Sequence, residues 1–353
     1  MKPKTLAFYL PQYHPIPEND KWWGDGFTDW LSVVQSRPRF PEHYQPHLPR
    51  DLGFYDLRLD VIREKQIELA QKYGVDGFIY YHYWFSGKRI LSTPLDMLLE
   101  NKNLDFPFCL TWANESWTNT WGPTEGSRTG EASLINQEYS EVDFQKHIEW
   151  LYEKVFVDRR YIHHGNRPIF IVYRPSLISD IDNMMKTWKE YCEKIEKPFP
   201  YMLWVESFED EKSDRYLQYG FSGSVEFQPR PDLRGKVLPG NDDYIYSYEE
   251  AIDMSILESL PERLRYPGVM PGWDNSARRK NKATIYHGSE PKLYCKWLKE
   301  ALHKACNINR EEQSYVFINA WNEWAEGCHL EPDLKWGTAF LEAHHEAVNS
   351  LDL

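Results

Sequence analysis

The sequence predicts an α/β protein with the fold of a (β/α)8 TIM barrel that carries long loops after its strands. Eight short apolar runs typical of strands recur along the 353 residues, and helix-like segments separate them. Runs such as Pro168–Tyr173, which are apolar at nearly every position, indicate strands buried on both faces, as in parallel sheets. Eight such strands alternating with helices over this length favour a closed barrel.

The expected strands span Thr5–Leu10, Gly77–Tyr83, Phe108–Ala113, Pro168–Tyr173, Tyr201–Glu206, Gly223–Phe227, Gly268–Pro271 and Ser314–Ala320. A doubly wound sheet is the alternative fold, and it usually carries a Gly-rich phosphate-binding turn after its first strand. Here Pro11-Gln12-Tyr13-His14-Pro15 follows that strand, so the turn is absent. No linker, repeat or low-complexity tract divides the sequence, and we therefore expect residues 1–353 to form a single domain.

The expected helices carry apolar residues on one face. In Asp60–Tyr73 these recur at Val61, Ile62, Ile67, Leu69 and Ala70, and Gly74 follows as a stop signal. The same test identifies Val142–Phe156, Ile181–Ile195, Tyr248–Leu260, Lys292–Cys306 and Gly337–Leu351. The longest loops, residues 11–59, 114–141, 228–247 and 272–291, all follow strands. In a barrel they leave the C-terminal face, where active sites are built.

Charge and cysteine content exclude several classes of protein. The net charge of −13 would repel nucleic acids and anionic membranes. No apolar run approaches the roughly 18–20 residues needed to cross a bilayer, so we expect no membrane insertion. The five scattered cysteines and the histidines show no metal-ligand spacing, and we expect no metal or cofactor. Leu6–Leu10 is too short for a signal-peptide core, which favours a cytoplasmic location unless an export signal has been removed.

Three short polar motifs have structural interpretations. Asp180-Ile-Asp182 resembles a metal-binding DxD motif, but it directly precedes an amphipathic run and is expected to cap that helix. The doublets His163-His164 and His344-His345 are expected to be exposed. The cysteines are expected to be reduced and mostly buried.

The aromatic content is unusually high, with 15 Trp, 23 Tyr and 17 Phe residues. A core rich in aromatic side chains explains Phe and some Tyr. It explains Trp less well, because large amphipathic rings are rarely buried completely. Sugar rings have apolar C–H faces that stack on indole, so the composition favours a carbohydrate-binding cleft and a carbohydrate substrate.

Polar and aromatic residues cluster where the expected strands end, and we take them as candidate substrate-binding residues. The set is Tyr9, Gln12 and His14; Tyr81, His82, Tyr83 and Trp84; Trp112, Asn114, Glu115 and Trp117; Trp204, Glu206 and Glu226; Trp273 and Asn275; and Asn319, Trp321 and Asn322. A barrel built for stability alone has no reason to collect such residues at one rim. Tyr81, Tyr83 and Trp204 are equally compatible with a role in the core.

Glu323 and Glu326 are the candidate catalytic acids. They are three residues apart after the last strand, so a helical segment would place both carboxylates on one face. Like charges held close together raise one pKa, which yields an acid and a base in one pocket. The alternative, a solvated acidic turn, fits poorly with Trp321 and Trp324 alongside. Glu115, followed by Glu206 or Glu226, could instead supply the acid pair or bind sugar hydroxyls.

Four motifs in order resemble one family of carbohydrate-active enzymes. They are Phe8-Tyr-Leu-Pro-Gln-Tyr-His-Pro15, Trp112-Ala-Asn-Glu-Ser-Trp117, Gly272-Trp-Asp-Asn-Ser-Ala-Arg278 and Trp321-Asn-Glu-Trp-Ala-Glu-Gly327. The last resembles the signature of glycoside hydrolase family 99, the endo-α-mannosidases. Nearly the whole chain resembles the related WbsX-like proteins of bacterial polysaccharide loci.

The resemblance implies a (β/α)8 barrel and a retaining mechanism without a metal. It implies that Glu323 deprotonates the sugar 2-hydroxyl, which attacks C1 to form a 1,2-anhydro sugar. Glu326 would protonate the leaving oxygen and then activate water. Ala325 stands where the mannosidases have His, so the resemblance does not extend to the sugar.

Three functions are compatible with these features. The first is a retaining glycoside hydrolase acting on a bacterial or dietary polysaccharide or oligosaccharide. The second is a glycosyltransferase of O-antigen or lipopolysaccharide biosynthesis, which needs a nucleotide- or lipid-linked donor. The third is a carbohydrate-binding protein without catalytic activity. The sugar, its linkage, endo or exo action and the oligomeric state are left open by the sequence.

Overall fold

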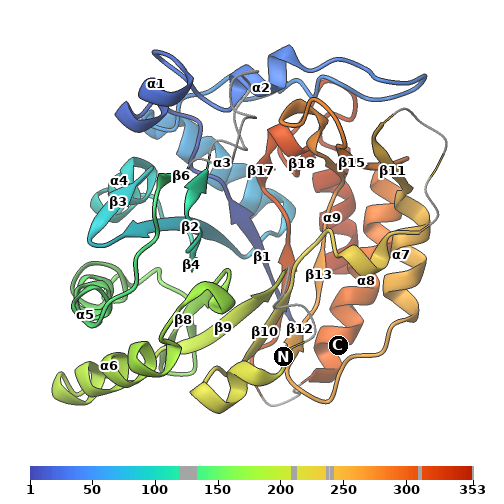
Figure 1. Ribbon diagram of the computed structural model, residues 1–353. Coiled ribbons are helices and arrows are strands. Elements are labelled where there is room, and N and C mark those ends of the chain that lie inside the picture. The colour runs from blue at the N-terminus through green and yellow to red at the C-terminus, as the bar shows by residue number, and fades with distance from the viewer. Residues whose placement is uncertain (119–132, 208–212, 236–237, 239–241, 309–311, 352–353) are drawn as a thin grey trace.

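The strands form a nearly closed parallel barrel in the computed structural model, which describes residues 1–118, 133–207, 213–235, 238, 242–308 and 312–351 (Figure 1). Along the sheet the strands are β12 (Arg265–Tyr266), β10 (Gly223–Glu226), β9 (Tyr201–Glu206), β8 (Arg167–Val172), β4 (Phe108–Trp112), β2 (Gly77–Phe85), β1 (Lys4–Tyr9), β16 (Tyr315–Ile318) and β13 (Gly268–Val269). Each neighbouring pair in this order is parallel. The expected barrel is confirmed.

The barrel closes through one chain segment that pairs on both sides. β12 pairs with β10, and β13, just beyond Pro267, pairs with β16. The expected strand Gly268–Pro271 therefore begins earlier and is split at the proline, which has no N–H to donate to a ladder. A Cβ on Gly268 would lie 1.9 Å from the carbonyl oxygen of Glu226, so only glycine allows this close approach.

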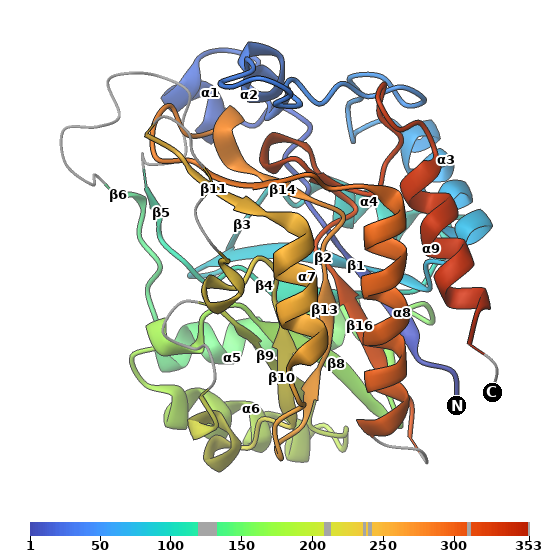
Figure 2. The ribbon, with the colours of Figure 1, turned by 90° about the vertical axis from the view of Figure 1, so that its right-hand side faces the viewer.

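Helices cover the outside of the barrel. They are α3 (Asp60–Tyr73), α4 (Thr93–Glu100), α5 (Glu141–Trp150) with a π-helical turn at Leu151–Val155, α6 (Ile181–Lys194), α7 (Tyr248–Leu257), α8 (Pro291–Ile308) and α9 (Ala339–Asn349). All six expected helices are present, and α4 is an addition. Between β9 and β10 the described chain has a short 3₁₀ helix, Arg215–Tyr219, in place of an α-helix. Figure 2 shows α7, α8 and α9 side by side on one flank.

Small elements gather over the C-terminal ends of the strands, at the top of Figure 1. They include α1 (Pro17–Trp23), α2 (Trp30–Gln35), a sheet of β11 (Tyr244–Ser247), β15 (Thr284–His287) and β14 (Trp273–Asp274), and two hairpins, β17 (Asn322–Glu323) with β18 (Cys328–His329) and β5 (Trp117–Thr118) with β6 (Ser133–Ile135). β3 (Lys88–Ile90) extends β2, and β7 (His163–His164) pairs with β8 at the opposite end. The long loops thus build the roof of the barrel, although the loop at 114–141 lies partly outside the described residues.

Several local expectations can be compared with the structure. Asp180 caps α6, because its Oδ1 accepts a hydrogen bond from the Asn183 amide at 3.1 Å. All five cysteines are unpaired, and four of them are buried. The expectation that both histidine doublets are exposed was wrong at one position in each. His344 lies on the buried face of α9, where Thr5 Oγ1 is 3.2 Å from its Nε2, and His164 is buried as well. Among the described helices, none combines the length and apolarity needed to span a bilayer.

Candidate active site

A cavity of about 550 Å³ opens at the C-terminal end of the barrel. Its wall comes from the C-terminal ends of the barrel strands and from the loops that follow them. Ten of the expected site residues line it: Gln12, Tyr81, Tyr83, Glu115, Trp117, Glu206, Trp273, Asn275, Glu323 and Glu326. The cavity therefore opens at the end of the barrel at which the sequence places the candidate site.

The two candidate acids lie on a tight hairpin after β16. Glu323 ends β17, a three-residue 3₁₀ turn covers Trp324–Glu326, and the chain reverses at Gly327, whose φ is +56°. Side chains three residues apart eclipse each other in a 3₁₀ turn, so Glu323 and Glu326 face the same cavity. The 3₁₀ turn therefore places both carboxylates on one face, as a helical segment was expected to do.

Arg278, from the loop after β14, joins the two acids. Its Nη1 lies 2.7 Å from Glu326 Oε1, and its Nη2 lies 3.4 Å from Glu323 Oε2. The same Nη2 lies 2.5 Å from Asp29 Oδ2, next to α2. Three carboxylates thus share one guanidinium, and all four side chains line the cavity.

Burial and mutual repulsion shift the protonation of this group. Glu323 is 5% exposed, and its pKa rises to about 8 because of burial, the neighbouring Glu326 charge and Asp29, against the opposing effect of Arg278. The pKa of Glu326 is also raised by burial, while Arg278 lowers it. With one cation among three carboxylates, the pair holds a proton near neutral pH, the state that general acid catalysis requires.

Buried hydrogen bonds fix the hairpin to the first strand. Asn322 pairs with the backbone of Leu10: its Oδ1 accepts from the amide at 2.7 Å and its Nδ2 donates to the carbonyl at 3.0 Å. The Tyr13 hydroxyl donates to the Asn322 carbonyl at 2.8 Å and accepts from the Trp324 amide at 3.1 Å. Residues on both sides of Glu323 are therefore held, although Asn322 itself lies behind the cavity.

Glu331 anchors the indoles that flank the acids. It accepts hydrogen bonds from the Nε1 atoms of Trp321 at 3.0 Å and Trp324 at 2.7 Å. Tyr55 and Gln66 donate to it at 2.8 and 2.6 Å. Burial raises its pKa to about 7 in spite of these donors. Trp321 thus serves the scaffold and does not line the cavity.

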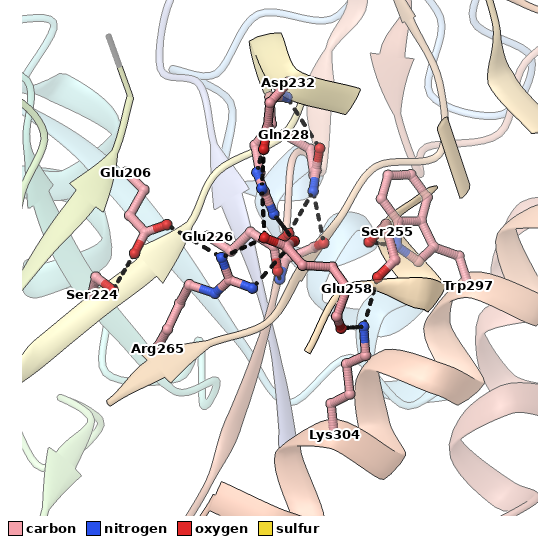
Figure 3. Close-up of polar contacts among 12 residues, drawn as sticks. Glu206, Ser224, Glu226, Gln228, Asp232, Ser255, Glu258, Arg265, Trp297 and Lys304 are labelled. Atoms are coloured by element: carbon pink, nitrogen blue, oxygen red, sulfur yellow. Dashed lines mark hydrogen bonds and ion pairs between the residues drawn. The ribbon is translucent and has the colours of Figure 1, made fainter. Parts of the chain in front are cut away.

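The rival acids Glu206 and Glu226 belong to a buried ionic cluster (Figure 3). Glu226 accepts from Arg230 Nη1 at 2.7 Å and from the Gly268 amide at 3.2 Å, at the closure of the barrel. Glu206 lies 2.6 Å from Arg263 Nη2 and accepts from the Ser224 hydroxyl at 2.6 Å. Glu226 lies outside the cavity, whereas Glu206 reaches its wall already paired. Glu115 is paired as well, with Arg174 Nη1 at 2.7 Å.

Strand alternation explains which residues of β2 reach the site. Successive side chains point to opposite faces of a strand. Tyr81 and Tyr83 point into the cavity, while His82 and Trp84 point outward beneath α5, where Trp84 Nε1 donates to Asp143 at 2.8 Å. His82 and Trp84 are therefore corrected from site to packing positions.

The remaining expected residues outside the cavity are also packing or backbone-binding groups, namely Tyr9, His14, Trp112, Asn114, Trp204 and Asn319. Tyr9 donates to Gln66 at 2.7 Å, and Asn319 donates to the Gln228 carbonyl at 2.6 Å. Asn114 accepts from the Arg174 amide at 2.8 Å, which ties the end of β4 to that of β8. Asn114 and Asn319 thus tie strand ends together through buried amide hydrogen bonds, since buried amides require partners.

The structure adds residues that sequence reasoning missed, chiefly Asp29, Tyr173 and Arg278. Arg278 ends the Gly272–Arg278 motif, so a signal existed, but its partners are 45 or more positions away. Asp29 follows a polar loop, and no motif in the sequence identifies it as a site residue. Three further cations, Arg234, Arg279 and Lys282, lie at the exposed mouth of the cavity.

Comparison with known sequences agrees with the geometry. The profile of the family described as "Glycosyltransferase WbsX" matches residues 5–344. Two proteins named "Uncharacterized protein WxcX", from two strains of Xanthomonas campestris pv. campestris, are each 39% identical over 358 residues. These matches cover 98% of this chain and 50% of the relatives, so the chain spans about half the length of the curated proteins it matches.

Solved structures share the barrel at low sequence identity. The GH99 endo-alpha-mannosidase from Bacteroides thetaiotaomicron aligns over 98% of this chain and 96% of its own, with a TM-score of 0.60 and 15% identity. A "Glycoside hydrolase-like protein" aligns over 98% and 94%, with a TM-score of 0.63 and 12% identity. Identities this low bear on the fold alone, and they support the (β/α)8 architecture.

Proposed function

The chain belongs to the WbsX family, as its four motifs suggested, and from that premise we propose that it is a retaining glycoside hydrolase with Glu323 and Glu326 as its catalytic acids. One observation carries the proposal: two buried carboxylates share the Arg278 guanidinium on the wall of a roomy cavity. Perturbed acids that converge in a cleft are typical of catalytic sites. A purely structural ion pair would have no need of the open space before it.

The aromatic lining supports a carbohydrate as the substrate. Tyr81 and Tyr83 reach the cavity from β2, Trp117 from β5 and Trp273 from β14. Their rings offer stacking surfaces for the C–H faces of sugars, and Gln12, Asn275 and Ser207 offer hydrogen-bonding groups nearby. A cavity of about 550 Å³ with this lining can hold part of a polysaccharide or an oligosaccharide, which we take to be of bacterial or dietary origin.

The roles that the family resemblance implies require the proton shared by Glu323 and Glu326 to lie on Glu326 when the reaction begins. In the free protein Arg278 holds Glu326 more closely than Glu323, so the proton resides mainly on Glu323. For Glu323 to deprotonate a sugar 2-hydroxyl, that proton must pass to Glu326 when substrate binds. A hydroxyl that donates to Glu323 stabilises its ionised form and drives the transfer in this direction.

Aryl glycosides with graded leaving groups test this assignment. A polysaccharide and glycan screen first identifies a hydrolysed sugar. Glu326→Gln is then expected to lose turnover of natural glycans but to keep the first step, the release of dinitrophenol, on a dinitrophenyl glycoside, whose leaving group needs no proton. Glu323→Gln should lose both activities, because it blocks attack at C1. Glu64→Gln on the exposed face of α3 serves as the control. Normal turnover of natural glycans by Glu326→Gln would refute the proposal.

Glycosyl transfer is the second candidate, because the matching family is described as a glycosyltransferase. The cations Arg234, Arg279 and Lys282 at the mouth could receive the phosphates of an activated donor. Calorimetry with UDP- and GDP-sugars, with and without Mn²⁺, separates the two functions. Tight binding of a nucleotide sugar would favour transfer. Sugar binding that both Gln variants retain, with no hydrolysis by the wild type, would indicate a binding protein.

A further inference from the structure

A second cavity of about 440 Å³ lies on the other side of Trp273, which lines both cavities. The segment 42–47, after β1, forms one wall, and β14, β15 and residues 335–336 form the others. Three histidines line it, His43, His47 and His287. The proposed hydrolytic mechanism makes no use of this space.

At this second cavity His47 meets two residues from the far end of the chain. Its Nδ1 lies 2.9 Å from His329 Nε2, and one ring nitrogen of each histidine and one oxygen of Asp333 lie within 4.8 Å of one another. The residues are separated by up to 286 positions, so no spacing in the sequence could reveal the cluster. Among the described residues, this is the one group of three or more His, Cys, Asp or Glu side chains whose possible ligand atoms lie this close together.

The hydrogen bond at Nδ1 of His329 determines that Nε2 is the ring nitrogen with a free lone pair. Nδ1 of His329 lies 2.9 Å from the carbonyl oxygen of Glu331, which can only accept. Nδ1 must therefore carry the proton, and Nε2 presents its lone pair toward His47 and Asp333. Metal-binding histidines are commonly oriented by this kind of hydrogen bond to a backbone carbonyl.

Asp333 is held in place by two donors. Its Oδ2 accepts from the Tyr44 hydroxyl at 3.0 Å, and its Oδ1 accepts from the Trp336 amide at 2.6 Å. A carboxylate has about four lone-pair sites, so ligand capacity remains after both bonds. The adjacent Lys335 ammonium lies over the Tyr44 and Trp336 rings, 4.7 and 4.8 Å from their centroids.

We propose that His47, His329 and Asp333 bind one divalent zinc ion, with water from the second cavity as the fourth ligand. Two imidazole nitrogens and one carboxylate oxygen form a ligand set that suits zinc, and three protein ligands with one open position are a familiar arrangement. At zinc–nitrogen distances of about 2.0–2.1 Å, tetrahedral geometry separates two nitrogens by about 3.3 Å. The rings must therefore move apart by a few tenths of an ångström.

The ion would connect the loop after β1 to the segment that follows the candidate acids. His329 also stacks on Trp324, with ring centroids 3.8 Å apart, and it belongs to the same hairpin as Glu323. Zinc binding would thus stabilise the hairpin without entering the sugar cavity. The inference is independent of the proposed hydrolase activity, because it needs only binding.

Zinc affinity of the purified protein tests the site. The protein is stripped with a chelator, titrated with zinc chloride against a chromophoric competitor, and analysed for metal content after dialysis. We expect a single zinc ion per chain, a higher melting temperature with zinc, and affinity at least about tenfold weaker in His47→Gln and Asp333→Asn. His287→Gln, on the same cavity but outside the cluster, is the matched control and should bind as the wild type does.

Binding of Co²⁺ distinguishes the loss of a metal ligand from the misfolding of a variant. Co²⁺ bound by the wild type should give the intense visible absorption of a four-coordinate site, and His47→Gln should lose it while its far-UV circular dichroism is unchanged. Equal zinc affinity in the wild type and His47→Gln, or an equal loss in His287→Gln, would overturn the proposal. The His47–His329 contact would then be an ordinary hydrogen bond.

Discussion

Replacing Glu323 by Gln is expected to stabilise the folded protein at alkaline pH and to leave its stability at acidic pH nearly unchanged. Burial beside Glu326 raises the pKa of Glu323 from 4.5 to about 8. Between these pH values the folded state keeps a proton that the unfolded state has lost. Stability is therefore fully present below pH 4.5 and is lost as the pH rises through 8.

The size of this effect follows from the shift. At about 1.36 kcal/mol for each pKa unit, ionised Glu323 costs the fold about 5 kcal/mol above pH 8. A glutamine of the same shape removes that cost, and its amide oxygen can still accept from Arg278. Glutamine needs polar partners of its own, so we expect a gain of about 2–4 kcal/mol at pH 9 and little at pH 5.

Urea denaturation of the wild type and Glu323→Gln at pH 5, 7 and 9 measures the difference. Comparing the two proteins at each pH cancels the titration of the groups that do not interact with Glu323, while Glu326, which does, loses a neighbouring charge. Glu64→Gln, on the exposed face of α3, should show no pH-dependent difference. If the difference between wild type and Glu323→Gln were the same at all three pH values, the reasoning about the buried acid would be refuted.

Three other substitutions have definite expected outcomes. Arg278→Gln removes the shared cation and should lower kcat/KM on a hydrolysed glycan by about 10²–10³ with an altered pH–rate profile, whereas an unchanged profile would contradict its role. Tyr13→Phe leaves the Trp324 amide without its acceptor and should cost about 1–3 kcal/mol in urea denaturation, against almost nothing if that amide finds another partner. Gly268→Ala forces a Cβ onto the Glu226 carbonyl oxygen and should cost about 3 kcal/mol or more, measured as a lower melting temperature, and a wild-type melting temperature would refute the tight closure.

The location of the site was predictable from the order of elements. Once eight strands are recognised, their C-terminal ends must share one face, because parallel strands joined by helices all run in the same direction. Glu323 and Glu326 come directly after the last strand, and ten of the expected residues do line the cavity. Such placement depends only on position along the chain.

The direction of each side chain was harder to predict. In β2 the apolar and aromatic residues are continuous, so the sequence carries no alternation that separates Tyr81 and Tyr83 from His82 and Trp84. Both faces of the strand are buried, one toward the cavity and the other beneath α5. Only the closure of the barrel determines which set points inward, because a shift of one residue would exchange the two faces.

The sequence by itself therefore determined the barrel, the end at which its cavity opens and the candidate acid pair, since all three follow from periodicity and local spacing. Only the tertiary structure brought Arg278 and Asp29 to those acids and His47 to His329. It also paired Glu206 with Arg263. The physical reason is that charges are paired across the closed barrel, between segments up to hundreds of residues apart, and no local pattern encodes such a contact.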